Sequence, residues 1–196
     1  LIISQLTLGL VQGLGGRSLE GLAGKPPVIA CMVPTFENNS GIEIIASIKD
    51  FYGTNSIDYE WLTTVESLTD AVTAIALWEN IFTTYPELNT IFCVSSEAGY
   101  TAAQVMKERG LTSEDVTIIA ISDLDQTLDY IRSNQIYATM SENIPRVGYQ
   151  PAEWICTFAR TGEKPEKVEW DTGTFAITKE NVESYKTIEN DRKLWK

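Results

Sequence analysis

Short apolar runs alternate along this chain with longer segments of helical periodicity, and no other feature of the sequence constrains the fold as strongly. The apolar runs are Val28–Val33, Asp58–Thr63, Thr90–Val94, Val116–Ile121, Tyr137–Met140 and Thr174–Ile177. Most of these runs carry no alternating polar residues, which is typical of strands that are covered on both faces. The alternation predicts an α/β fold, a doubly wound parallel sheet whose strands are joined by crossover helices.

Five segments between or after these runs have apolar side chains at helical spacing. They are Ile42–Tyr52, Leu68–Tyr85, Gly99–Glu108, Asp125–Ser133 and Val147–Thr161. Pro86 ends the second segment, and Gly110 is placed to cap the third. An earlier segment, Thr7–Leu22, has similar spacing but contains five glycines. Because each glycine costs a helix about 1 kcal/mol relative to alanine, we expect a helix that breaks near Gly15 and Gly16.

Charge and missing residue types exclude several functions. A formal net charge of −12 with no basic stripe argues against nucleic acid, because phosphate binding depends on clustered Lys and Arg. The chain has no histidine, so Ser-His-Asp and Cys-His mechanisms lack their base and the commonest zinc ligand is absent. Cys31, Cys93 and Cys156 form no Cys-x-x-Cys pair, and the first two lie in apolar runs like small buried hydrophobes. We therefore expect no metal site and no enzyme.

Two further motifs bear on cofactor or metal binding. Gly13–Ser18 is rich in glycine, but serine stands where a dinucleotide motif needs its third glycine, and no strand–turn–helix context surrounds it. No cofactor is expected. Asp123 and Asp125 lie two residues apart after a predicted strand. They are compatible with a metal or acid–base site, and equally with a solvated helix N-terminus whose dipole favours carboxylates.

Short polar residues follow the predicted strands at their carboxyl ends. In open parallel sheets these ends meet at one edge, and ligands bind outside that edge. The candidate ligand-binding residues there are Phe36, Ser67, Ser95, Glu97, Ser122 and Asp123. Hydroxyls and carboxylates with an occasional aromatic ring suit a small, polar, uncharged ligand, because each buried ligand hydroxyl needs a partner. The alternative is that these residues only cap the following helices, since Ser, Asp and Asn are preferred N-caps.

Four motifs occur in an order and spacing that resemble a known family. They are YPELNTIFCVSSEA at residues 85–98, AAQVMKERG at 102–110, VTIIAISD at 116–123 and DYIRSNQIYATM at 129–140. Together they resemble the type I periplasmic sugar-binding proteins, whose fold is shared by LacI-type regulators. The resemblance covers about residues 24–185. It implies a Rossmann-like, ligand-binding lobe without catalytic activity.

The resemblance also implies positions for the ligand contacts. They fall on Ser95, Ser122 and Glu142, where the family usually has Asn, Asp and Gln or a similar polar residue. The arginine with which the family binds sugars would lie near residues 43–44 and has no counterpart, which puts pentose or hexose binding in doubt. Phe36 and Tyr100 are the aromatic residues that could stack on a ring face, with core packing as the alternative for both.

By the same resemblance, this chain is the carboxyl-terminal part of a two-lobe protein. Residues 1–140 would be the carboxyl-terminal lobe, starting at the first hinge crossing. Residues 141–170 would be a second crossing and a helix of the missing amino-terminal lobe, residues 171–188 the return strand and end of the lobe, and residues 189–196 a tail. A helix face prepared for an absent lobe is an exposed apolar surface, so self-association into a homo-oligomer is expected.

These implications predict a non-catalytic solute-binding protein that holds a small polar, sugar-like ligand between two lobes for ABC import or sensing. Its partners would be the missing amino-terminal lobe and a membrane permease or sensor. Its location would be extracytoplasmic, either periplasmic or lipid-anchored. The alternative is the effector-binding domain of a cytoplasmic LacI-type regulator. A third alternative, a doubly wound enzyme, lacks histidine, a phosphate-binding loop and a convincing nucleophile.

Overall fold

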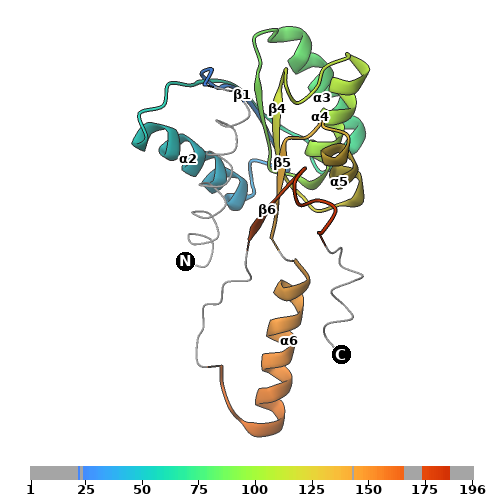
Figure 1. Cartoon of the computed structure of the whole chain (residues 1–196). Coiled ribbons are helices and arrows are strands. Elements are labelled where there is room, and N and C mark those ends of the chain that lie inside the picture. The colour runs from blue at the N-terminus through green and yellow to red at the C-terminus, as the bar shows by residue number, and fades with distance from the viewer. Residues whose placement is uncertain (1–21, 23, 143, 166–173, 186–196) are drawn as a thin grey trace.

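The computed structural model describes residue 22 and residues 24–142, 144–165 and 174–185, which form a six-stranded sheet flanked by helices (Figure 1). The strands are β1 (Val28–Val33), β2 (Glu60–Glu66), β3 (Thr90–Cys93), β4 (Thr117–Ile121), β5 (Ala138–Ser141) and β6 (Phe175–Thr178). The helices are α2 (Asn39–Thr54), α3 (Ala71–Thr84), α4 (Ser96–Glu108), α5 (Asp125–Arg132) and α6 (Ile144–Thr161). The predicted α/β fold is confirmed.

The strands follow the order β2-β1-β3-β4-β5-β6, and the first five are parallel. From β1 the chain passes to β2 on one side, and from β2 it crosses to β3 on the other side of β1. Open α/β sheets bind ligands at such switch points. β6 is antiparallel to β5, a feature that the sequence pattern did not predict. Phe175 pairs with Ser141, the last residue of β5. The chain thus leaves and re-enters the sheet at the same end, so β6 runs in the opposite direction.

Apolar side chains cover both faces of the sheet, which confirms the doubly wound arrangement. On one face, Ala30 and Met32 of β1 join the cluster that includes α3, α4, α5 and the fully buried Trp78. On the other face, Ile29 and Cys31 pack with the apolar residues of α2. Figure 1 shows α2 on one side of the strands and α3, α4 and α5 on the other. Burial on both faces explains why β1 is continuously apolar.

The two cysteines in strands are part of the core, as predicted. Cys31 and Cys93 are 0% and 1% exposed, respectively. Burial raises the pKa of both thiols above the ordinary value, so neither readily forms a reactive thiolate. Cys156 lies exposed on α6.

Side-chain caps, rather than apolar spacing, set where two helices begin. Asn38 Oδ1 accepts a hydrogen bond from the Ser40 N–H at 3.0 Å, and α2 therefore begins earlier than its apolar spacing indicates. Asp70 Oδ2 accepts from the Thr73 N–H at 2.8 Å, and α3 begins later than predicted. Gly110 has φ +74° just after α4, which confirms the predicted cap.

The remaining boundaries differ at β2 and at the starts of α4 and α6, each of which begins three residues earlier than predicted. This strand covers Glu60–Glu66 instead of Asp58–Thr63, because as a half-buried edge strand it lacks the continuous apolar run that marks the central strands. The other strands agree with their predicted ranges to within one residue at each end. Of the predicted helix Thr7–Leu22, only Leu22 is described, and it is buried. The first and third hinge crossings and the tail at 189–196 lie outside the described residues.

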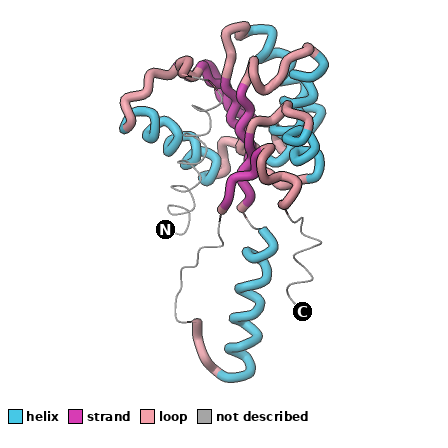
Figure 2. The backbone as a smooth tube through the Cα atoms, in the orientation of Figure 1, coloured by secondary structure: helices cyan, strands magenta, loops and turns pink. Residues whose placement is uncertain are grey.

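The helix α6 stands apart from both helical layers and extends beyond the end of the sheet at which β5 stops (Figure 2). Its Val147, Ile155 and Phe158 side chains are 46%, 69% and 48% exposed. Several exposed apolar side chains on one helix indicate a surface that packs against another protein segment. Within the described ranges, no helix combines the length and the apolarity that crossing a membrane requires.

Candidate functional site

All five parallel strands end at the same edge of the sheet, and polar residues in the turns that follow them are linked there by hydrogen bonds. We call this region the polar edge and define it as residues 34–37, 66–67, 95–97, 122–123 and 141–142. Every candidate residue from the sequence lies in it: Phe36 after β1, Ser67 after β2, Ser95 and Glu97 after β3, Ser122 and Asp123 after β4, and Glu142 after β5.

Three of these residues form one buried group that links the ends of β2 and β3, which lie on either side of β1. Ser67 Oγ lies 3.2 Å from Ser95 Oγ and 3.2 Å from the Val33 carbonyl oxygen, and it donates to the Glu97 carboxylate. Ser67, Ser95 and Glu97 are 0%, 4% and 5% exposed. Ser95 occupies the N-cap position of α4, yet its side chain makes no capping hydrogen bond. Helix capping therefore does not account for Ser95, whose hydroxyl instead faces Ser67.

Glu97 is a buried carboxylate with one oxygen unsatisfied. It lies in the first turn of α4, where the helix dipole favours negative charge. Its Oε1 accepts the Ser67 hydroxyl, whereas Oε2 is buried without a hydrogen-bond partner among the described residues. A buried acceptor left unpaired costs roughly 1–3 kcal/mol. Oε2 is thus a buried acceptor that no donor in the described part of the chain satisfies.

The turn after β1 is tied to the end of β2 by a second carboxylate. Glu66 Oε1 accepts the Thr35 hydroxyl at 3.1 Å and also the backbone N–H of Phe36. The Phe36 side chain is 47% exposed, so the core-packing alternative is wrong for this residue. Tyr100 is half-buried on α4. Phe36 therefore has an exposed aromatic ring at the polar edge, on a backbone that is held by the hydrogen bond to Glu66.

Asp123 is the centre of a second hydrogen-bonded group. Its Oδ2 accepts the Tyr185 hydroxyl at 2.6 Å and the Ser141 hydroxyl at 3.1 Å. Leu124 is the N-cap of α5 and Asp125 its exposed first-turn acid, so the interpretation as a helix N-terminus holds for Asp125 and is wrong for Asp123. In the described chain, no group of three or more acidic or cysteine residues is arranged to hold a metal ion.

The backbone of Ser122 forms hydrogen bonds with the Thr139 side chain, and these link the end of β4 to β5. Its N–H donates to Thr139 Oγ1 at 3.0 Å, and the Thr139 hydroxyl donates to the Ser122 carbonyl at 2.7 Å. The Ser122 Oγ accepts from the Leu124 N–H at 3.3 Å, which is a local turn interaction. Part of the hydrogen-bonding capacity of Ser122 is therefore used to shape the turn.

Glu142 lies next to the Asp123 group in an environment that disfavours charge. Partial burial raises the pKa of the Glu142 carboxyl, and the negative charge of Asp123 raises it further. Glu142 thus keeps its proton to higher pH than an ordinary glutamate does.

Three residues of this arrangement were not identified from the sequence: Thr139, Ser141 and Tyr185. Thr139 and Ser141 alternate along β5 with apolar residues, and this is a usable signal. Tyr185 gives none, because it is 62 residues from Asp123 in the chain.

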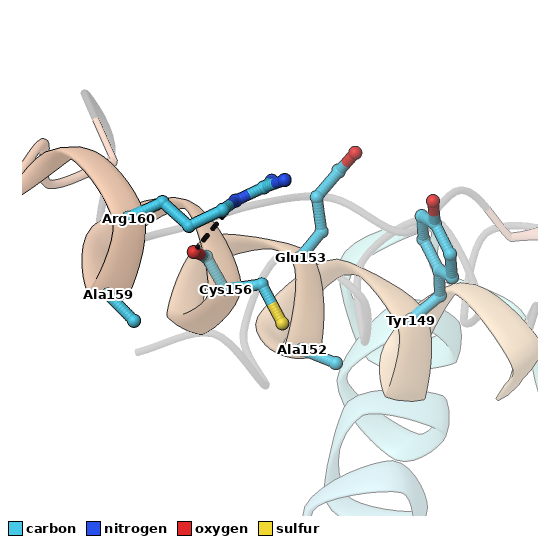
Figure 3. A pocket seen from close by; sticks show the side chains of 6 residues that line it. All are labelled: Tyr149, Ala152, Glu153, Cys156, Ala159 and Arg160. Carbon is cyan, nitrogen blue, oxygen red and sulfur yellow. Dashed lines mark hydrogen bonds between the residues drawn. The ribbon is translucent and has the colours of Figure 1, made fainter.

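An open hollow lies along α6, away from the polar edge (Figure 3). Its lining consists of Tyr149, Ala152, Glu153, Cys156, Ala159 and Arg160. Arg160 Nε donates to the Cys156 carbonyl at 3.3 Å, so this side chain lies along its own helix. Because one helix supplies all of these residues, the hollow is a helix face and not an enclosed ligand site.

A doubly wound lobe with a polar edge at its strand ends has the architecture of a periplasmic-binding-protein lobe. Residues 10–164 match the family described as periplasmic binding protein domain, and the chain belongs to this family. The resemblance seen in the sequence is thereby confirmed. A comparison with curated proteins gave no match.

Solved structures share the fold at low sequence identity. A carbohydrate transporter solute-binding protein from Agrobacterium radiobacter, in complex with D-arabinose, has a TM-score of 0.81 at 19% identity, over 98% of this chain and 63% of that one. A sugar-binding protein of a sugar ABC transporter from Bacillus halodurans has a TM-score of 0.80 at 18% identity, over 92% and 64%. The XylFII–LytSN complex has a TM-score of 0.76 at 21% identity, over 89% and 60%. This chain spans less than two thirds of each.

Proposed function

We propose that this chain is the carboxyl-terminal lobe of a two-lobe solute-binding protein, and that the polar edge is its half of the ligand site. The observation that carries the proposal is the Ser67–Ser95–Glu97 group, in which polar side chains from two strands are buried together at the switch point of the sheet. Buried hydroxyls and a carboxylate with an unpaired oxygen are costly for stability. Their presence at the edge where such sheets bind ligands supports a role in binding.

A second lobe would complete this site. We assign residues 1–140 and 171–188 to the carboxyl-terminal lobe, residues 141–170 to a crossing and a helix of the other lobe, and residues 189–196 to a tail. The position of α6 beyond the polar edge, with Val147, Ile155 and Phe158 exposed, supports this assignment. Without the other lobe, the same apolar surface would favour self-association of the chain.

The ligand would be a small polar solute held between the lobes, for import by an ABC permease or for recognition by a membrane sensor. The family and the sugar-binding proteins of similar fold support this class, and the XylFII–LytSN complex supports a sensor as a partner. Such a protein works outside the cytoplasm, in the periplasm or on a lipid anchor. Ligand binding shifts the lobes toward closure only by the difference in its affinity for the closed and open states.

The test is a thermal-stability screen of the full-length protein against sugars, polyols, amino acids and nucleosides. A ligand at about 100 times its Kd stabilises the folded protein by roughly 2.7 kcal/mol, which is a clear rise in Tm. The Ser95→Ala variant should lose most of this rise, whereas Ser133→Ala, an exposed serine at the far end of α5, should keep it. A flat response across the whole panel, or an equal response in both variants, would contradict the proposed site.

A further inference from the structure

The hydroxyl protons of the Ser67–Ser95–Glu97 group have a defined order. Ser67 has one hydroxyl proton, and the Glu97 carboxylate is the strongest acceptor within its reach. With that proton used, the 3.2 Å contact between Ser67 Oγ and Ser95 Oγ requires Ser95 to be the donor. The direction is therefore from Ser95 to Ser67 to Glu97. Ser95 then offers lone pairs, and no proton, to any group that approaches it.

Two other carboxylates of the polar edge, Glu66 and Asp123, also accept hydrogen bonds from neutral groups. Glu66 accepts from Thr35 and from a backbone N–H, and Asp123 accepts from Ser141 and Tyr185. Within the described ranges, neither these two carboxylates nor Glu97 forms an ion pair with Lys or Arg. A negative potential of this kind attracts cations and repels anions.

Glu97 supplies an independent indication that this group holds a negative charge without a positive partner. Its side chain is more than nine-tenths buried, and its Oε2 has no hydrogen-bond partner among the described residues.

We infer, resting on the proposed function above, that the ligand carries a protonated amine on a hydroxylated scaffold, as an amino sugar does. Its ammonium group donates to Ser95 Oγ, with the Glu97 carboxylate as the counter-charge behind it. An ammonium group has three donors and no acceptor, which matches the acceptor at Ser95 and the negative charge of Glu97. This ligand class differs from the uncharged ligand expected from residue types alone, because the partners that fix the direction of these hydrogen bonds are known only from the structure.

Matched pairs of sugars test this inference on the full-length protein by calorimetry: D-glucosamine against D-glucose and D-galactosamine against D-galactose, at a pH where the amines are protonated. N-acetyl-D-glucosamine and D-gluconate are the uncharged and anionic controls. We expect an amino sugar to bind more tightly than its neutral partner by about tenfold or more, which corresponds to about 1.4 kcal/mol. Neutral sugars or gluconate binding as tightly as the amines would overturn the inference and leave the proposed function standing. Absence of binding by all six compounds would count against both.

Two variants with the same change of charge locate the effect. Glu97→Gln should bring the affinity ratio within each pair close to one without abolishing binding of the neutral sugar. Glu87→Gln, an exposed glutamate before β3 at the opposite edge of the sheet, should retain the wild-type ratio. A wild-type ratio in Glu97→Gln would overturn the role of Glu97. If that variant does not fold, the ratios of the wild-type protein and of Ser95→Ala still decide the inference.

Discussion

The substitution Gly99→Ala tests how closely α4 must approach the sheet for the polar edge to form. A methyl group at Gly99 would lie 2.8 Å from Cβ of Ala120 in β4. The Ala120 side chain is 0% exposed and cannot rotate away, because a Cβ atom is fixed by its backbone. Carbon atoms pack at about 3.5–4.0 Å, so α4 would have to move away from β4 by roughly 1 Å.

The expected loss of stability follows from two opposing effects. Alanine gains about 1 kcal/mol over glycine inside a helix, while overpacking a core costs about 1–3 kcal/mol, so Gly99→Ala should be less stable by about 1 kcal/mol. Gly53→Ala is the matched control, since a Cβ atom there has no neighbour within 4 Å. This control should be more stable than the wild type by up to about 1 kcal/mol.

Urea denaturation followed by far-UV circular dichroism measures both free energies of unfolding. Because Ser95 and Glu97 precede Gly99 at the start of α4, the shift of this helix should also weaken the rise in Tm produced by a bound solute. Gly53→Ala should leave that rise unchanged. Equal stability of the two variants would refute the reasoning, since it would mean that α4 has room for a methyl group against β4.

Three further predictions concern the core and the charge of the polar edge. Trp78→Phe removes the 3.1 Å hydrogen bond from Trp78 Nε1 to the Ala98 carbonyl, which keeps the Thr101 hydroxyl as a donor, and this loss should cost about 0.5–1.5 kcal/mol in urea denaturation; a cost near zero would contradict this. Burial and the charge of Asp123 raise the pKa of Glu142 in the folded protein, so folding is favoured while Glu142 is protonated. This contribution to stability is complete below the ordinary pKa of a glutamate, and it is lost as the pH rises through the raised pKa of the folded state. Glu142→Gln should therefore gain stability over wild type with rising pH, and a pH-independent difference would contradict this. In the native protein a thiol reagent should label the exposed Cys156 and should reach Cys31 and Cys93 only on unfolding; rapid native labelling at more than one cysteine would refute their burial.

The central strands could be predicted because their burial on both faces leaves an unbroken apolar run. In β4, all five residues are buried, and the sequence indicates the strand to within one residue. In β2, at the edge of the sheet, every residue but the first is only half-buried, and the sequence pattern predicts this strand too early in the chain. At the start of α3, the error comes from the conformation of the preceding turn. Leu68 and Thr69 have positive φ and cannot belong to α3, although their apolar spacing fits it.

The candidate site could be predicted only as a set of positions. The rule that parallel strands share a carboxyl edge is sufficient to bring Ser67, Ser95 and Glu97 together. It does not show that Ser95 leaves its helix uncapped, that Glu97 Oε2 lacks a partner, or that Tyr185 contacts Asp123. These facts depend on side-chain directions and on contacts between distant parts of the chain, which residue types and spacing do not determine.

The most direct test of the central claim, that the polar edge is the ligand site, is hydrogen–deuterium exchange of the full-length protein with and without a stabilising solute. We predict slower exchange of backbone amides in the turns at 34–37, 66–70, 95–98, 122–125 and 141–142, and little change at the amino ends of the same strands. Protection concentrated along the outer face of α6 or in the turns before the strands would contradict the claim, because the solute would then bind elsewhere on the lobe.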